Sequence, residues 1–294
     1  MSNEHDEDAT ASKSPKTIVT TKEKNEKSSY IKNSQERTKE IASLYAINAM
    51  ISRSHEQDLQ QRTEHREKIE QQRKQHNLEV IIKLAHDACG DETAGDPDPD
   101  WLVRFFSMAQ NIHGTSMQKL WGRILKQEIL SAGSVSLKAL ETLQNMTQRE
   151  AQTFQRASVL ACHFGNDSSK RLLTGINIKK GRFPLLKQNS SHKLQLGNYQ
   201  LPYSNLLILM ELGLLLRTEL ESGEISLDHT LPFSYQNNSN MLKAMKKGTT
   251  FTYYRFSPTG QELARLLGNK DHEAYKENLL DLLSKHFIVE SALT

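Results

Sequence analysis

The feature that most constrains the fold is the absence of proline and glycine from Gln35 to Ala88. Apolar residues stand at helical spacing near the start of this stretch and resume between Leu78 and Ala85, whereas residues 52–76 are almost all polar. A long run without either helix breaker, apolar at both ends, predicts a helix. We therefore expect one long helix over residues 34–89, or two helices joined end to end, with Ser34 as the N-cap.

This helix leaves two interpretations open. Coiled coils keep apolar residues at the a and d positions over several heptads, and the middle of the helix has only Leu59 and Ile69 as large apolar side chains. It is therefore either a solvated charged helix or a coiled coil used for self-association. Residues 1–33 contain few large apolar residues, so we predict a disordered tail there.

Charge divides the rest of the chain. Residues 87–100 carry only acids among their charged side chains, and residues 90–98 are predicted to form an acidic linker. The residue spacing of a calcium-binding loop is absent, so we expect no metal site. The net charge of the whole chain is only +3. The excess of bases lies after residue 100, where the folding signals are also strongest.

Residues 99–164 predict a helical core. Asp98 and Pro99 have the positions of an N-cap and a first helical residue, and Gly114 and Gly133 end the first two helices. A third helix starts at Ser136, and a capping box at residues 147–150 starts a fourth that runs to about residue 164. The two tryptophans lie in the first helical pair, where we interpret them as core residues.

The last segment, residues 165–294, predicts a winged-helix-like α+β module. A helix over 203–212 ends at Gly213, and expected strands follow at 214–217, 224–227 and 249–256. A long ribbon tip over 235–248 separates the last two strands, and helices at 261–267 and 272–286 complete the module. The fold class predicted for the whole chain is mainly α.

A winged helix binds nucleic acid with a helix in the major groove and a basic ribbon at the phosphate backbone. The candidate phosphate contacts lie in the basic segment after residue 169, in the ribbon tip and in the strand that follows. They are Lys179, Lys180, Arg182, Lys243, Lys246, Lys247 and Arg255. The alternative is a winged fold used only for packing or for protein contact.

No motif points to catalysis. The sequence lacks phosphate-binding and dinucleotide-binding glycine loops, a nucleophile elbow and a zinc-protease helix. Glu128, on the helix of the second tryptophan, is expected to form a structural pair with Arg123 or Arg104. We expect a protein without enzymatic activity or cofactor. The lack of a signal peptide and of a membrane-length apolar run predicts a cytoplasmic protein.

Several stretches resemble a known family: residues 75–81, the Pro99 start with its aromatics, the run Leu120–Glu128 and the helix from Ser136. They are similar to a bacterial family with gammaproteobacterial relatives, the domain of unknown function 2806, over roughly residues 70–270. The positions that carry the resemblance include Trp101, Phe105, Leu120, Trp121, Arg123 and Glu128. The family implies no activity. The region 120–154 also resembles the alpha-type abortive-infection proteins of phage defence.

These observations favour a cytosolic scaffold or regulatory protein that binds another macromolecule, with a protein partner or self-association first. A DNA- or RNA-binding regulator is the second hypothesis, and a phage-defence effector is the third. If the chain binds nucleic acid, Lys179, Lys180, Arg182, Lys246 and Lys247 must form one contiguous basic face.

Overall fold

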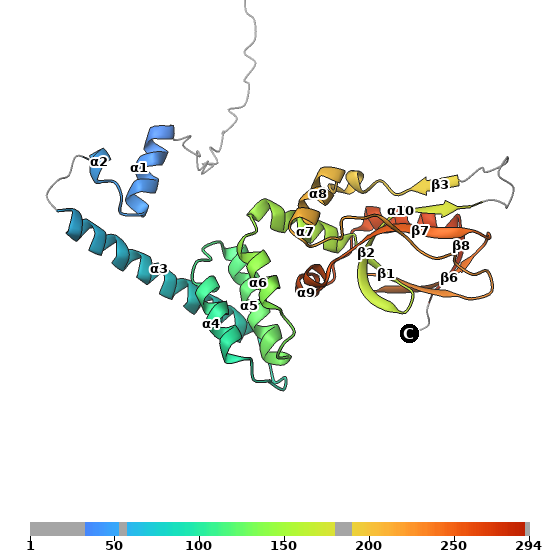
Figure 1. The fold of residues 1–294 in the computed structure, drawn as a ribbon, viewed down its shortest axis with the longest axis horizontal. Helices are drawn as coiled ribbons and strands as arrows, with labels where there is room; N and C mark the ends of the chain where they lie inside the picture. The colour runs from blue at the N-terminus through green and yellow to red at the C-terminus, as the bar shows by residue number, and fades with distance from the viewer. Residues whose placement is uncertain (1–32, 53–57, 180–189, 292–294) are drawn as a thin grey trace, which may run out of the picture. The chain divides into compact units, whose positions relative to one another are not determined.

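The computed structural model describes residues 33–52, 58–179 and 190–291 (Figure 1). The chain divides into two compact units, residues 1–66 and 67–294, and helix α3 (Leu59–Ala88) begins in the first and ends in the second. Of the bases expected to bind nucleic acid, Lys180 and Arg182 lie outside the described residues, as does most of the tail predicted over 1–33. Within the described ranges, no helix is long and apolar enough to cross a membrane.

The helix predicted over 34–89 is interrupted. Helix α1 (Ser34–Leu44) is capped by Asn33, one residue before the expected Ser34, and Glu36 completes a capping box. Ala46 has φ of +53°, a left-handed backbone conformation that a helix cannot continue through. A short helix, α2 (Ala49–Ser52), follows before α3. The prediction of a single unbroken helix is therefore wrong, although most of the described stretch is helical.

Three helices form the core predicted after residue 98. They are α4 (Pro99–Ala109), α5 (Thr115–Leu130) and α6 (Leu137–Gln144). Asp98 Oδ1 accepts a hydrogen bond from Trp101 N at 2.8 Å, and Ser136 caps α6, so both expected starts are confirmed. The ring of Phe105 packs between Trp101 at 5.1 Å and Trp121 at 5.2 Å. These aromatic contacts join α4 to α5 in the hydrophobic core.

The fourth predicted helix is shorter than expected. Helix α7 (Gln148–Val159) has the predicted capping box of Thr147 and Glu150, but it ends five residues before 164. Strand β1 (Cys162–Phe164) occupies the rest of the predicted helix. Gln236 Nε2 donates to Val159 O at 2.6 Å and so satisfies a carbonyl at the end of α7.

The C-terminal segment is α+β, as expected, but it is not a winged helix and the chain is not mainly α, because the described C-terminal residues form an eight-stranded antiparallel sheet. Its path order is β4-β7-β2-β1-β5-β6-β8, and β3 pairs with β2. The strands are β1, β2 (Asp167–Ile178), β3 (Ser190–Lys193), β4 (Leu220–Glu221), β5 (Leu231–Tyr235), β6 (Asn238–Ala244), β7 (Thr249–Arg255) and β8 (Phe287–Ser291).

The main error concerns the ribbon tip predicted over 235–248. Residues 231–244 form the β5–β6 hairpin, and Gln236, with φ of +51°, lies in its turn. The hairpin is anchored on both sides, since β5 pairs with β1 and β6 pairs with β8. The expected tip is therefore part of the sheet itself, and the fold class is α+β.

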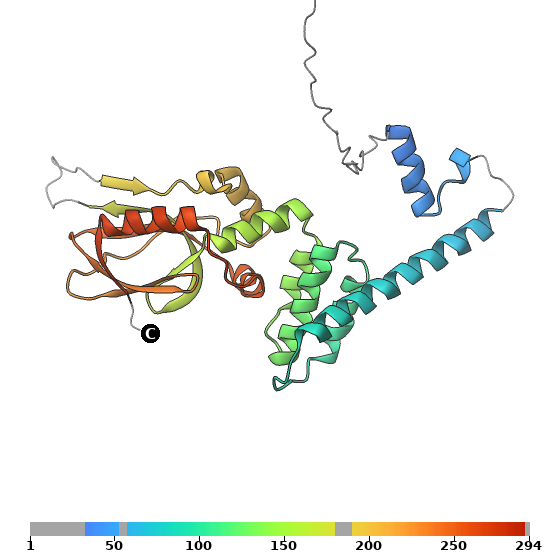
Figure 2. The same cartoon turned by 180° about the vertical axis from the view of Figure 1, so that it is seen from behind.

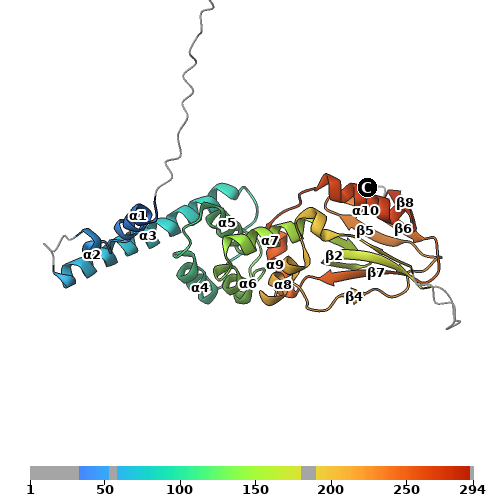
Figure 3. The ribbon, with the colours of Figure 1, turned by 90° about the horizontal axis from the view of Figure 1, so that it is seen from above.

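The sheet is curled and covered by helices. Phe251 of β7 and Phe287 of β8 lie near opposite ends of the strand order, yet their rings are 5.3 Å apart. Helix α10 (Glu273–Ser284) runs beside β5, β6 and β8 (Figure 3), and its buried Tyr275 contacts Tyr235 at 5.3 Å. Helices α7, α8 (Tyr203–Glu211) and α9 (Pro258–Leu266) lie between the sheet and helices α4–α6 (Figure 1).

Helix α9 connects the two parts of the second unit. Glu262 on α9 accepts hydrogen bonds from Ser136 N at 2.9 Å and Ser136 Oγ at 2.7 Å, at the start of α6. On the side of the sheet, Gln261 Oε1 accepts a hydrogen bond from Lys170 N in β2 at 2.8 Å, and Gln261 Nε2 donates to Lys170 O at 3.0 Å. The helical core and the sheet therefore share a bonded contact.

Candidate functional site

The structure brings together three of the bases expected to bind nucleic acid. Lys179 follows β2, and Lys246 and Lys247 lie in the turn between β6 and β7. Lys179 N donates to Gly248 O at 3.0 Å, which joins the two segments. Gly248 has φ of +78°, and a Cβ there would collide with the carbonyl oxygen of Lys179. Glycine is therefore required for this close approach.

We call this region the basic sheet end and define it as Lys179, Lys246, Lys247 and Lys285. Lys285 belongs to it because Met245 N, next to Lys246, donates to the carbonyl of His286 at 3.0 Å. Two of its bases have acidic partners, Lys179 with Glu221 at 2.9 Å and Lys285 with Asp281 at 2.5 Å. Lys246 and Lys247 are exposed and form no ion pair within the described residues.

Acidic groups also border the basic sheet end. The pKa of Glu221 is lowered by hydrogen bonds, first from Thr250 and then from Lys179. Glu224 Oε1 accepts a hydrogen bond from Gly248 N at 2.8 Å and holds the turn after Lys247 in place. Lys246 and Lys247, the two lysines without an ion pair in the described structure, therefore lie in a turn that is fixed by neighbouring strands and carboxylates.

Two histidines beside the basic sheet end were not predicted as site residues. The rings of His192 on β3 and His286 before β8 have centroids 4.3 Å apart. His286 is only 5% exposed, and neither ring nitrogen has a hydrogen-bond partner in the described structure. Burial lowers its pKa, and the neighbouring His192, Lys246 and Lys285 lower it further. The two residues are remote in sequence, so no local pattern could have identified them.

The other predicted bases do not join this cluster within the described structure. Arg255 lies at the opposite end of β7 from the basic sheet end, where its Nη2 contacts Asp167 Oδ2 at 2.9 Å. The same carboxylate oxygen accepts from Arg171 at 2.9 Å. Arg255 is therefore part of an ion-pair network on the sheet, away from the basic sheet end, and its role as a phosphate contact stays a prediction. Lys243 is exposed within β6, opposite Ile288.

The residues of the family resemblance are mostly structural. Trp101, Phe105 and Trp121 are buried, Leu120 packs partly buried against the same core, and Arg123 is exposed. Glu128 is 1% exposed, but its expected ion pair is wrong. Its carboxylate instead accepts from Gly133 N at 2.5 Å and Val135 N at 3.0 Å, which fixes the loop between α5 and α6.

Two further residues hold α3 against this core (Figure 2). Gly122 on α5 faces α3 so closely that a Cβ would lie 3.0 Å from the Cβ of Leu84. Asn77 on α3 is buried, and its side chain donates to Gln110 O at 2.8 Å and accepts from Gln118 Nε2 at 3.2 Å. Both residues lie in the stretches that carry the family resemblance, and both have a packing role.

Nothing in the described geometry assembles a nucleophile or a metal centre. Burial raises the pKa of the Cys162 thiol to about 12, so the thiol is protonated at neutral pH. The described residues contain no group of three or more His, Cys, Asp or Glu arranged to hold a metal ion.

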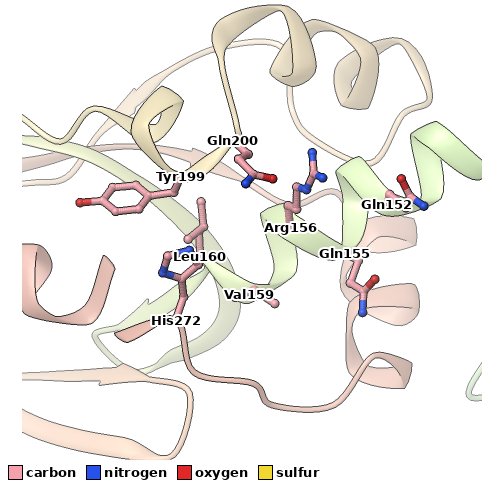
Figure 4. A pocket seen from close by; sticks show the side chains of 8 residues that line it. All are labelled: Gln152, Gln155, Arg156, Val159, Leu160, Tyr199, Gln200 and His272. Carbon is pink, nitrogen blue, oxygen red and sulfur yellow. The ribbon is translucent and has the colours of Figure 1, made fainter. Parts of the chain in front are cut away.

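A pocket of about 320 Å³ opens between α7, the 3-10 helix η2 (Leu196–Tyr199) and the residue before α10 (Figure 4). Its lining comprises Gln152, Gln155, Arg156, Val159, Leu160, Tyr199, Gln200 and His272. Most of these side chains are polar and none is acidic. None of these residues is among the site residues predicted from the sequence.

The observed architecture defines an α+β class of protein, in which a helical core is bonded through α9 to a curled antiparallel sheet. A model of the family described as protein of unknown function, DUF2806, matches residues 61–280. The chain belongs to this family, as the resemblance predicted. No curated protein and no solved structure matches the chain. The resemblance to abortive-infection proteins stays a prediction.

Proposed function

We propose that this protein is a non-enzymatic cytosolic binding protein that self-associates through its N-terminal helices. One observation carries the proposal. Six large apolar side chains between residues 41 and 51 have exposed fractions between 46% and 81%. They are Ile41, Leu44, Tyr45, Ile47, Met50 and Ile51. Such a concentration of exposed apolar side chains typically marks an interaction surface.

The composition of this segment favours a second copy of the chain as its occupant. Ala42 is the only buried residue that α1 contributes. Acids and bases are balanced on α1, with Glu36 and Glu40 against Arg37 and Lys39, so the helix has no dominant charge that would select an oppositely charged protein. A face with apolar residues and both signs of charge can complement itself around a two-fold axis. Burying the apolar residues would then stabilise the dimer.

The test is the mass of the full chain in solution, measured by light scattering after gel filtration. We expect about twice the 33.5 kDa of one chain for the wild type and the single-chain mass for Ile47→Gln with Met50→Gln. The matched control is Val103→Gln, because Val103 is 68% exposed but lies on α4. A wild type of single-chain mass, or a double variant that keeps the dimer mass, contradicts the proposal.

The second candidate function is nucleic-acid binding at the basic sheet end. The observation that favours it is the bond between Lys179 N and Gly248 O, which brings bases from two distant segments to one place. Lys246 and Lys247 have no acidic partner in the described structure, so phosphates could replace their counterions without breaking an ion pair. The backbone-positioning contacts of DNA-binding proteins have this chemistry.

Fluorescence anisotropy with random-sequence DNA and RNA at rising salt tests this candidate. Micromolar binding that weakens steeply with salt, and weakens further in Lys246→Glu with Lys247→Glu, is the expected result. Lys119→Glu with Lys138→Glu makes the same change in net charge at exposed lysines of α5 and α6, and it should bind like wild type. Equal weakening by both pairs would indicate a nonspecific charge effect and would overturn this site.

A further inference from the structure

The pocket between α7 and η2 has the chemistry of a small-ligand site. The side chain of Arg156 projects from α7 and has no ion-pair or hydrogen-bond partner within the described residues. No acid lines the pocket, so an anionic ligand would meet its positive charge without competition. Arginine binds phosphate and carboxylate groups through two parallel N–H donors.

The opposite wall has a constrained backbone. Gln200 has φ of +60°, which is uncommon for a residue other than glycine. Its N–H donates to Gly197 O at 3.1 Å, and its carbonyl accepts from Asn205 Nδ2 at 3.3 Å. Figure 4 shows Gln200 facing Arg156 across the pocket. Gln200 is the C-cap of η2, and these backbone bonds fix the wall of the pocket that faces Arg156.

The remaining lining combines amides with an apolar floor. Gln152 lies four residues before Arg156, on the same face of α7, and Gln155 lies one residue before it. Val159 and Leu160 supply the apolar surface at the end of α7. A glutamine amide has a donor and an acceptor side by side, which matches the edge of a nucleobase. A guanidinium and several amides around an apolar floor therefore suit a ligand with a phosphate and a heterocyclic base.

We propose that this pocket binds a nucleoside monophosphate, with the phosphate on Arg156 and the base edge on the glutamine amides. The volume of about 320 Å³ lies at the small end of the range of ligand pockets, roughly 300–1,000 Å³, and so favours a mononucleotide over a larger cofactor. The site shares no residue with either proposed macromolecular interface. It would make the binding protein responsive to a small molecule.

Isothermal titration calorimetry of the full chain with AMP tests the proposal, with inorganic phosphate and adenosine as partial probes. We expect saturable AMP binding, a loss of about tenfold or more in affinity in Arg156→Gln, and weaker binding of either partial probe. Arg149→Gln is the matched control, because Arg149 is exposed on the same helix but does not line the pocket. Circular dichroism melting establishes that both variants are folded.

Three results would overturn this assignment. They are no AMP binding by folded wild type, equal loss in the Arg149 and Arg156 variants, and phosphate binding as tight as AMP binding. Phosphate binding as tight as AMP binding would mean that the glutamine amides make no contact with the base that contributes to affinity. Because Lys246 and Lys247 lie on a different part of the fold, their double variant should bind AMP like wild type, which separates this site from the nucleic-acid candidate.

Discussion

Helices α1–α2 and helices α4–α5 carry similar apolar patterns but end in opposite environments. On α4 and α5, Trp101, Phe105 and Trp121 are at most 6% exposed, and each contacts another aromatic ring. On α1 and α2, Leu44 and Met50 are 60% and 81% exposed. Periodicity therefore identifies the apolar face of a helix but does not say whether the same chain covers it. The exposure of the apolar side chains on α1 and α2 among the described residues is the observation behind the proposed self-association.

The largest expected effect is at the covered face. Trp121→Ala should lower the free energy of unfolding by about 3–5 kcal/mol, because it removes a fully buried ring and leaves a cavity beside Phe105. Trp121→Phe should cost clearly less, since the indole N–H has no hydrogen-bond partner in the described structure. Urea unfolding of both variants measures the difference. Equal losses would show that the N–H, rather than the ring volume, is what the site requires.

The next effect tests how closely the covered helices approach. Gly122→Val should destabilise by about 1–3 kcal/mol, because its side chain would press on Leu84 and the backbone of Ala85 in α3. Gly223→Val is the control, since no atom lies within 4 Å of a Cβ built at this exposed loop residue. Thermal melting compares the two variants. A tolerated valine would mean that α3 does not pack against α5 as described.

A smaller effect on stability comes from His286, a buried side chain without a hydrogen-bond partner in the described structure. Burial lowers the pKa of His286, so below the ordinary histidine pKa of about 6.5 the unfolded chain binds more protons than the folded chain. Stability should therefore fall as pH drops from 7 to 5. One such histidine changes the free energy of unfolding by at most about 1.4 kcal/mol per pH unit.

His286→Phe should flatten this pH dependence, which urea unfolding at pH 7, 6 and 5 measures. The slope should not vanish, because burial also lowers the pKa of His163, and Lys170 lowers it further. His229→Phe is an exposed control and should keep the wild-type slope. An unchanged slope in the His286 variant would show that this imidazole is not buried as a neutral ring.

The smallest stability effect belongs to the uncovered face. Ile47→Gln with Met50→Gln should change the free energy of unfolding of the dissociated chain by no more than about 0.5 kcal/mol per site, because neither side chain is buried. Unfolding at low protein concentration measures this value apart from association. A large loss would mean that the face is covered within the chain, and the comparison between the two pairs of helices would then fail.

Local signals in the sequence predicted the helical core well. Asp98, Ser136 and Thr147 all cap helices as expected, because a cap depends on residues three or four positions away. The buried aromatics of α4 and α5 follow from helical periodicity in the same way. Short-range patterns were sufficient for these helix starts and faces, but they missed the break at Ala46 and the β5–β6 hairpin.

The sheet could not be predicted in this way. Cys162 pairs with Tyr235 in β5, and Ala244 pairs with Phe287 in β8, so each pairing joins distant segments. Residues 160–164 continue a helical pattern, and only β5 and β2 on either side stabilise them as strand β1. The predicted wing was wrong because the residues of its tip pair with strands β1 and β8, which lie far from it in the sequence.

The candidate sites show the same division. The bases Lys179, Lys246 and Lys247 could be found from composition, but the bond that unites them requires the fold. No signal in the sequence pointed to His286 or Gln200. What distinguishes His286 is a buried ring without hydrogen-bond partners in the described structure, and what distinguishes Gln200 is its backbone φ angle; neither can be read from a sequence pattern. Arg255 pairs with the carboxylate of Asp167, a contact between distant segments that the sequence alone could not indicate.

The strand order also has a kinetic consequence. Helices α4–α6 are built from contacts between neighbours in sequence, whereas β1 is completed only by β5, and β6 only by β8. Structures rich in local contacts fold faster than those that depend on distant pairing. During synthesis the helices can form soon after they leave the ribosome. Strands β1 and β6 each keep an unpaired edge until the strand that completes them has been synthesised. That interval, rather than the finished fold, is when we expect this chain to be most prone to aggregation.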